Sequence, residues 1–259
     1  MKKLSPIAIQ NKSDFFNQII ENTKYFTQFV IFALNHHDII LYADNTQTPT
    51  VMMIYDNPAC ILYGDITDAD VSEFIAKIPE HTYIVGQHPS WNPILKSHLP
   101  NINIYPRNLF DASTLSKDHL VQMMTKLPEG YEIRQINTVT IPNDQMIQED
   151  LLNRFFDKSD FVHSGFGFGL YYNNDMIGFI ATNYPVVSDE AEVYVRVDYN
   201  SQPIHRHKGF GLQLSIYFLL ECFKKGYVPI WDSANDISAQ LALKLGFVLK
   251  EAWEMFYFE

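Results

Sequence analysis

The stretch IHRHKGFGLQLSIYFLLECFKKGY, residues Ile204–Tyr227, joins a short basic, glycine-spaced segment directly to an amphipathic helix. Apolar side chains recur every three or four residues along one face of this helix, at Leu212, Ile216, Leu219, Leu220, Phe223 and Tyr227. The other face is expected to carry the polar residues Gln213, Glu221, Lys224 and Lys225. Gly226 is expected to end the helix in the left-handed conformation that glycine adopts at little cost. The stretch therefore predicts a loop that leads into one long, half-buried helix.

The run RHKGFG, Arg206–Gly211, has two interpretations. Backbone N–H groups at a helix N-terminus lack intrahelical acceptors and lie at the positive end of the helix dipole, so they bind anions. Gly209 and Gly211 have no Cβ that would keep a bulky diphosphate from the backbone, and Arg206 and Lys208 add positive charge. The alternative is an ordinary strand-to-helix turn whose basic side chains are solvated.

Better-known glycine motifs do not fit the chain. A Walker loop would need Gly-Lys-Ser/Thr, and a dinucleotide fingerprint would need further glycines where Leu212 and Ser215 stand. The earlier run GFGFGL, Gly165–Leu170, also has the wrong spacing, and no helix follows it. Its glycines are expected to serve strand packing, with room for a ligand as the alternative.

Composition limits the class of protein. The 259 residues are 47% hydrophobic and 19% charged, which is enough apolar material for packed cores and leaves little for long disorder. A formal net charge of -11 argues against a nucleic-acid partner and suits a cationic or amine-bearing small substrate. We expect a cytoplasmic protein with no membrane partner, because neither a signal peptide nor a membrane-spanning run is evident.

Cysteine and histidine usage does not indicate a metal. Cys60 and Cys222 lie far apart, with no second thiol or histidine at metal-ligand spacing. Each is expected to be a small buried hydrophobe.

The chain divides by pattern near residue 125, within a short helix followed by the start of a strand. Residues 1–125 are expected to form a mixed α/β domain without a chemical motif. Residues 126–259 are expected to form a second domain in the order helix, three strands, helix, strand, helix and a final strand pair over 247–259. Asn173-Asn174-Asp175 predicts a hairpin between the first two of these strands.

The later run WDSANDISAQLALKLGF, Trp231–Phe247, ends a strand and begins a second helix. Asn235 or Asp236 can cap this helix, whose apolar stripe is expected at Ile237, Leu241 and Leu245. Gly246-Phe247 is typical of a left-handed helix end followed by a hydrophobic contact.

Together these two motifs resemble the GNAT superfamily of acyl-CoA-dependent N-acyltransferases. The family's Gln/Arg-x-x-Gly-x-Gly/Ala signature at a helix start is matched by Arg206–Gly211. Its later Asn, short helix and Gly-Phe pair are matched by Asn235, Ser238, Leu241, Gly246 and Phe247, so that the resemblance covers about residues 130–259. Residues 229–247 are similar to the group that includes the zwittermicin A resistance proteins, which also have a divergent N-terminal half. Residues 1–125 could then be a degenerate copy of the same fold.

The resemblance implies a C-terminal mixed, mostly antiparallel sheet flanked by helices, with acetyl-CoA or another acyl-CoA as co-substrate and no metal. The sheet would separate between EVYVRV and VPIWDS to admit the thioester. Strand backbone would bond the pantetheine arm, backbone N–H groups of the loop would hold the diphosphate, and the second helix would contribute two polar contacts. The residues implied to bind the co-substrate are Val195, Val197, Arg206, His207, Lys208, Gly209, Phe210, Gly211, Leu212, Asn235 and Ser238.

Catalysis needs a proton acceptor and a proton donor. An alkylammonium with a pKa of about 10.4 must lose a proton before it attacks. By resemblance Glu192 is the expected base and Glu190 a second candidate, the alternative being that both are solvent-facing strand charges. Many relatives place a tyrosine acid where this chain has Ala242, so Tyr194, Tyr217 or water is left to protonate the thiolate.

The expected function is transfer of an acetyl group from acetyl-CoA to a primary amine of a small molecule by direct attack. The alternative is a non-catalytic module that binds or senses acyl-CoA, which the alanine at position 242 favours. A third possibility is N-acylation of a protein or peptide. The sequence does not indicate the acceptor, the acyl length or the oligomeric state.

Overall fold

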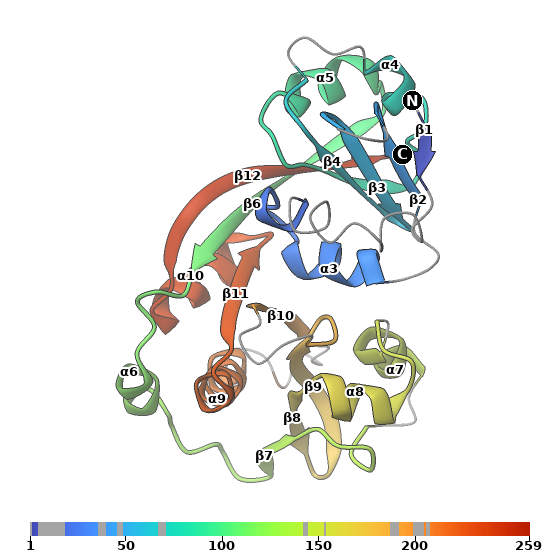
Figure 1. Cartoon of the computed structure of the whole chain (residues 1–259). Helices are drawn as coiled ribbons and strands as arrows, with labels where there is room; N and C mark the ends of the chain where they lie inside the picture. The colour runs from blue at the N-terminus through green and yellow to red at the C-terminus, as the bar shows by residue number, and fades with distance from the viewer. Residues whose placement is uncertain are drawn as a thin grey trace. The chain divides into compact units, whose positions relative to one another are not determined.

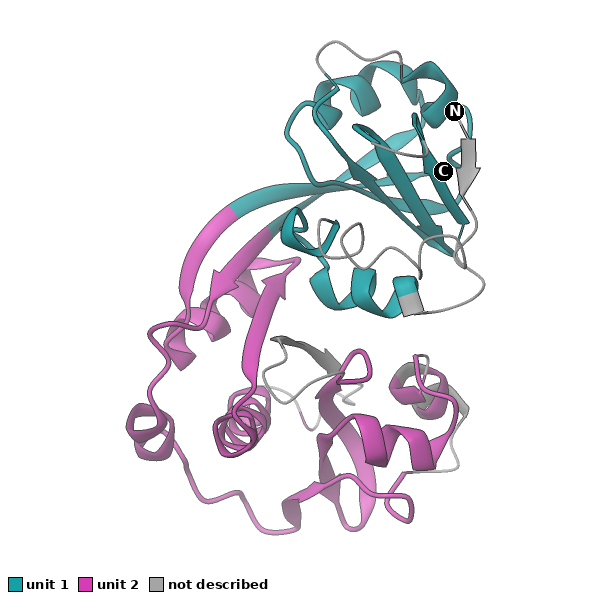
Figure 2. Cartoon of the chain, in the orientation of Figure 1, with its two compact units in different colours: residues 1–107, 252–259 teal, residues 108–251 magenta. Residues whose placement is uncertain are grey.

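The computed structural model describes residues 2–4, 19–35, 40–45, 49–66, 71–141, 145–152, 154–186, 192–198, 205 and 208–259. The chain forms two compact units, which are residues Met1–Arg107 with Ala252–Glu259, and residues Asn108–Glu251 (Figure 2). Two long strands, β6 (Ile102–Asp111) and β12 (Val248–Phe258), contribute residues to both units. The joint proposed near residue 125 falls inside the second unit, between α6 (Lys117–Gln122) and β7 (Tyr131–Gln135).

The first unit is a mixed sheet with helices on both faces (Figure 1). Its strands pair in the order β1-β2-β3-β4-β5-β12, antiparallel throughout except for the parallel pair β4–β5. Because both faces are covered, the inner strands β3 and β4 are mostly continuous apolar runs and not alternating patterns. The elements are β1 (Lys2–Leu4), α3 (Thr27–Asn35), β2 (Ile40–Ala43), β3 (Met52–Asp56), β4 (Ala59–Tyr63), α4 (Ser72–Ile75), β5 (Thr82–Gly86) and α5 (Trp91–His98).

The second unit is also a mixed sheet between helices (Figure 1). Strands β7, β8, β9 and β10 pair antiparallel in sequence order, β10 pairs parallel with β11, and β11 pairs antiparallel with residues Asn108–Phe110 of β6. The prediction of a mixed, mostly antiparallel sheet flanked by helices is therefore confirmed. The remaining elements are α7 (Gln145–Leu152), α8 (Lys158–Ser164), β8 (Gly167–Tyr172), β9 (Asp175–Thr182), β10 (Glu192–Asp198), α9 (Phe210–Lys225), β11 (Val228–Ser233) and α10 (Asp236–Leu245).

Local turn chemistry was predicted correctly in this unit. Asn173 and Asn174, at φ 49° and 74°, connect β8 to β9 in a two-residue turn. Gly226 and Gly246, at φ 73° and 105°, end α9 and α10 in the left-handed conformation. Asn235 is the residue that caps α10, since its side chain accepts a hydrogen bond from the Ser238 N–H at 2.9 Å.

The helix faces were predicted less well. Gln213 was assigned to the polar face of α9 but is only 4% exposed, and Phe223 of the predicted apolar stripe is 41% exposed. The reason is that α9 is covered on two sides. One side packs on β8 and β9 through Phe210, Leu214, Phe218 and Cys222, and the other packs against α6 and α10 through Ile216 and Leu219. A single stripe does not describe such a helix.

Two further expectations were wrong. Ile237 of the predicted apolar stripe is 84% exposed, because no element that the structure describes covers it at the start of α10. Leu245 of the same stripe is fully buried, as predicted. Residues Val248–Phe258 form one strand and not the predicted pair. This segment contains no Gly, Pro, Asn or Asp that would turn the chain.

Both cysteines are buried free thiols, Cys60 in the first unit and Cys222 in the second, as predicted for small hydrophobes. Burial raises the pKa of each thiol. Both therefore contribute through packing.

The glycines of β8 are required by close packing. A Cβ at Gly167 would lie 2.6 Å from the Ile180 carbonyl oxygen and 2.9 Å from the Ala181 Cβ on β9. A Cβ at Gly169 would lie 2.7 Å from the Tyr171 ring. The structural interpretation of GFGFGL is thus correct, and these positions leave no space for a ligand.

Alanine at two glycines should have opposite effects on stability. Gly167→Ala is expected to destabilise the second unit by about 1–3 kcal/mol, because backbone of β9 must move. Gly211→Ala is expected to stabilise it by about 0.4–1 kcal/mol, since a Cβ there would meet only Leu241 Cδ2 at 3.9 Å in a helical position. Urea unfolding followed by circular dichroism checks both variants. Equal midpoints for the two variants would contradict the packing argument.

Candidate active site

The second unit contains a gap between two neighbouring parallel strands. Strands β10 and β11 pair only over Glu192–Tyr194 with Val228–Ile230 (Figure 1). Beyond these residues β10 continues to pair with β9 over Val195–Asp198, and β11 pairs with β6 over Trp231–Ser233. Among the described residues no strand bonds the facing edges of these segments, so the separation that the sequence resemblance implied is present.

The N-terminus of α9 lies at the same end of the sheet as this separation, because α9 connects the parallel strands β10 and β11. Gly209 begins the helix at φ 75°, a left-handed conformation that favours glycine, and a Cβ there would meet nothing within 4 Å. The N-cap residue is a glycine and has no side chain to cap this end, so that, within the described residues, the N–H groups of the first turn are left for another acceptor. Of the predicted loop residues, Arg206 and His207 lie outside the described residues.

Lys208 contacts residues from outside the motif. Its Nζ donates a hydrogen bond to the Tyr131 hydroxyl at 2.9 Å and lies 4.9 Å from the centre of that ring. The same hydroxyl lies 2.8 Å from His205 Nδ1. Sequence reasoning missed Tyr131 and His205, because 74 residues separate them and no local pattern connects a strand start with a distant loop.

The start of α10 brings Asn235 and Ser238 together, as the motif predicted. Asn235 uses its side-chain oxygen as the helix cap, and the Ser238 hydroxyl accepts a hydrogen bond from Trp231 Nε1 at 3.0 Å. In the part of the chain that the structure describes, the exposed Asn235 side chain makes no bond through its amide N–H groups. These donors are therefore available to a ligand.

The residues considered for proton transfer lie in different surroundings. Glu192 and Tyr194 stand at the first and last positions of the β10–β11 pairing, while Glu190 lies outside the described residues. Ala242 is fully buried among Trp231, Leu245 and Phe247, where a tyrosine could not fit without displacing them.

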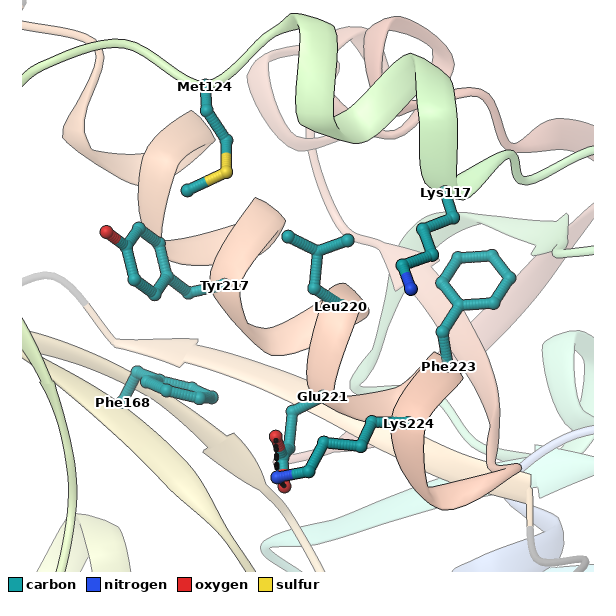
Figure 3. Close-up of a pocket in the computed structure, with 8 residues that line it drawn as sticks. All are labelled: Lys117, Met124, Phe168, Tyr217, Leu220, Glu221, Phe223 and Lys224. Atoms are coloured by element: carbon teal, nitrogen blue, oxygen red, sulfur yellow. Dashed lines mark hydrogen bonds and ion pairs between the residues drawn. The ribbon is translucent and has the colours of Figure 1, made fainter.

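Tyr217 lies in a groove beside the later turns of α9, and none of the residues that line this groove comes from β10 or β11 (Figure 3). Its ring packs on Phe168 of β8, with 5.9 Å between ring centres. The groove has a volume of about 530 Å³, and Lys224 pairs with Glu221 along its edge at 3.2 Å. The groove is lined by Lys117, Met124, Phe168, Tyr217, Leu220, Glu221, Phe223 and Lys224.

The described residues include neither a membrane-spanning helix nor a cluster of metal-ligating side chains. No helix within them is long and apolar enough to cross a membrane. No three or more of their His, Cys, Asp and Glu side chains are grouped so as to hold a metal ion.

Solved structures with the same fold come from several sources. A GCN5-related N-acetyltransferase-like protein from Streptococcus suis has a TM-score of 0.75 at 18% identity, with 95% of this chain and 99% of that chain covered. A tandem GNAT protein from the clavulanic acid biosynthesis pathway has a TM-score of 0.63 at 10% identity, covering 98% and 96%. A GNAT-family acetyltransferase from Colwellia psychrerythraea has a TM-score of 0.60 at 8% identity, covering all of both chains. The TM-scores show a likeness of fold, and at such low identities they show the fold alone.

The family itself is established by sequence. The model of the GNAT acetyltransferase family matches residues 21–256, although no curated protein matches the chain. The match begins far before residue 130, where the motif resemblance began, and so includes most of the first unit. The chain therefore belongs to the GNAT acetyltransferase family, whose members transfer an acyl group from acyl-CoA.

Proposed function

We propose that the chain transfers an acetyl group from acetyl-CoA to a primary amine of a small molecule by direct attack. The supporting observation is the early separation of β10 from β11 beside the uncapped N-terminus of α9. An extended chain that carries amides can bond an open strand edge as another strand would. A diphosphate suits the adjacent helix N-terminus. Acyl-CoA has both groups: the amide-bearing pantetheine arm follows the thioester, and the diphosphate follows the arm.

Each part of the co-substrate has proposed partners in this region. Successive residues of a strand point their backbone N–H and C=O groups to opposite edges. The backbone groups of Val195 and Val197 therefore point to the same edge of β10. The backbone from His207 to Leu212, with the Lys208 side chain, would bind the diphosphate. The Asn235 amide and the Ser238 hydroxyl would contact the co-substrate from α10. The formal net charge of -11 suits a cationic or amine-bearing small substrate, which supports a small-molecule acceptor.

The reaction would take place where β10 and β11 part. The amine nitrogen attacks the thioester carbonyl carbon, a C–N bond forms, and the C–S bond breaks. Glu192 takes the proton that the amine loses. It lies two residues before the last paired position, about 7 Å along the strand, a distance that the length of a glutamate side chain and one water can span together. A β10 backbone N–H polarises the carbonyl, and Tyr194 or water protonates the departing thiolate.

A second function is favoured by one observation. The buried Ala242 removes the tyrosine acid that many relatives have at this position. A chain without a proton donor could bind or sense acyl-CoA without turnover. Release of free thiol from acetyl-CoA separates the two functions, since an acyltransferase releases it only when an amine acceptor is present. A panel of primary amines, with peptide N-termini included, also separates small-molecule from peptide acceptors.

Binding should depend on Gly209. The parent is expected to bind acetyl-CoA in a calorimetric titration, and Gly209→Glu should bind at least about 100-fold more weakly, because a carboxylate would occupy the diphosphate position. Gly226→Glu is the matched control, since it makes the same change at φ 73° at the other end of α9. No binding by a folded parent would identify the loop as a simple basic turn.

Turnover should depend on Glu192. Glu192→Gln is expected to lower kcat by about 10²–10⁴-fold without changing acetyl-CoA affinity, because it removes the proton acceptor and keeps the shape. The loss should shrink as pH rises, since more of the amine is then already neutral. Thiol release measured between neutral and alkaline pH checks this. Wild-type turnover at every pH would eliminate Glu192 as the base.

Asn235 should affect both stability and affinity. Asn235→Ala is expected to lower the free energy of unfolding by about 1 kcal/mol, while Asn235→Ser keeps a cap. Both variants should bind acetyl-CoA more weakly, because each lacks the amide donor. Thermal unfolding and titration of the two variants check this. If the serine variant retains parental affinity, Asn235 is only a helix cap.

A further inference from the structure

Tyr131 contacts the proposed co-substrate loop at three positions. Its hydroxyl bonds His205 on one side of the two loop residues at 206 and 207, and Lys208 on the other. Its ring also packs on Phe210 in the first turn of α9, with 4.5 Å between ring centres. The Tyr131 side chain, at the start of β7, thus contacts His205 before the two loop residues, Lys208 after them, and Phe210 in the first turn of α9.

The hydrogen bonds define the state of this cluster. A lysine ammonium is only a donor, so the Tyr131 oxygen accepts from Lys208. The Tyr131 hydroxyl can at the same time donate its own proton to His205 Nδ1, so that one oxygen joins both loop residues. His205 is only 6% exposed, and Phe210 is fully buried. The contacts with His205 and Phe210 are therefore largely sheltered from water, where a lost hydrogen bond is costly, whereas the hydrogen bond from Lys208 is exposed to solvent.

The partners of Lys208 keep its charge available. Its ammonium contacts a neutral hydroxyl and the face of an aromatic ring. Among the residues that the structure describes, no carboxylate lies within ion-pair distance of Lys208, although the whole chain carries a net charge of -11. A lysine held in this way is oriented without being neutralised, which suits attraction of an anion.

We propose that Tyr131 is a positioning residue for this loop. Its hydroxyl and ring hold His205, Lys208 and Phe210 in the arrangement that a diphosphate requires before the co-substrate arrives. Binding then costs less conformational entropy, because His205, Lys208 and Phe210 are already held in place. This inference rests on the proposed function, since it assigns Tyr131 to the same co-substrate site.

Tyr131→Phe tests the hydroxyl and retains the ring. We expect the variant to bind CoA about tenfold more weakly, with kcat at saturating acetyl-CoA unchanged. The KM for S-acetylpantetheine, which lacks the diphosphate, should also be unchanged. Tyr172→Phe is the matched control: its ring lies 4.6 Å from that of Tyr131, but its hydroxyl makes no hydrogen bond within the described residues. Parental CoA affinity in Tyr131→Phe would overturn the proposal.

A double-mutant cycle tests the route through Lys208. Lys208→Met is expected to weaken CoA binding, and adding Tyr131→Phe to it should cause a much smaller further loss than in the parent. If the fold-loss of CoA affinity in the double variant equals the product of the two single fold-losses, Tyr131 does not act through Lys208. That result would overturn this part of the proposal.

Hydrogen exchange of the ligand-free protein separates this inference from the proposed function. The amides of Lys208–Leu212 should exchange faster in Tyr131→Phe than in the parent or in Tyr172→Phe. If the parent does not bind CoA, the proposed function fails, and faster exchange would still show that Tyr131 orders the loop. Equal exchange in all three proteins would overturn the ordering role.

Discussion

The candidate site depends on a parallel strand pair that ends after three residues. Backbone N–H and C=O groups need partners, and two adjacent strands ordinarily satisfy each other along their whole length. Here each strand is held from its far side once they part, β10 by β9 and β11 by β6. Both strands therefore stay paired within the sheet after they separate. Within the part of the chain that the structure describes, the facing edges of β10 and β11 are left open for another extended chain.

Helix α9 is packed firmly beside this separation. It enters beside the open end of the two strands and returns to β11, with one side packed on the aromatic surface of β8 and the other against α6 and α10. Phe166 and Phe218 stack with ring centres 4.6 Å apart. Gln213 extends this attachment by accepting a hydrogen bond from the Thr125 N–H and donating one to the Met123 carbonyl. A helix held from so many directions can present a fixed, uncapped N-terminus.

What the sequence predicted about this unit was mostly local. The hairpin at Asn173, the ends of α9 and α10 at Gly226 and Gly246, and the cap at Asn235 each depend on residues within one turn. The motifs at Arg206–Gly211 and Asn235–Phe247 then indicated the family. Neither pattern requires the rest of the fold to be known.

What the sequence did not predict depends on contacts between distant residues. The sixth strand of the second unit is the end of β6, which comes from before the proposed joint and pairs with β11. Ile237 is exposed and Gln213 is buried because of the elements that cover, or do not cover, each helix face. The periodicity of apolar residues does not indicate which elements these are. The cluster of Tyr131, His205 and Lys208 likewise joins a strand start to a loop more than 70 residues away.

The buried alanine of α10 constrains the chemistry of this chain. Ala242 packs against Trp231, and the Trp231 indole N–H donates a hydrogen bond to Ser238 in the first turn of α10. This face of α10 is therefore filled by packing contacts and leaves no room for a larger side chain. A proton donor for the thiolate therefore has to come from another element. Tyr217 is on the side of α9 that faces β8, whereas Tyr194 ends the paired part of β10. If the chain turns over acyl-CoA with a protein-derived acid, β10, the strand that we propose to bind the pantetheine arm, is the element best placed to provide it.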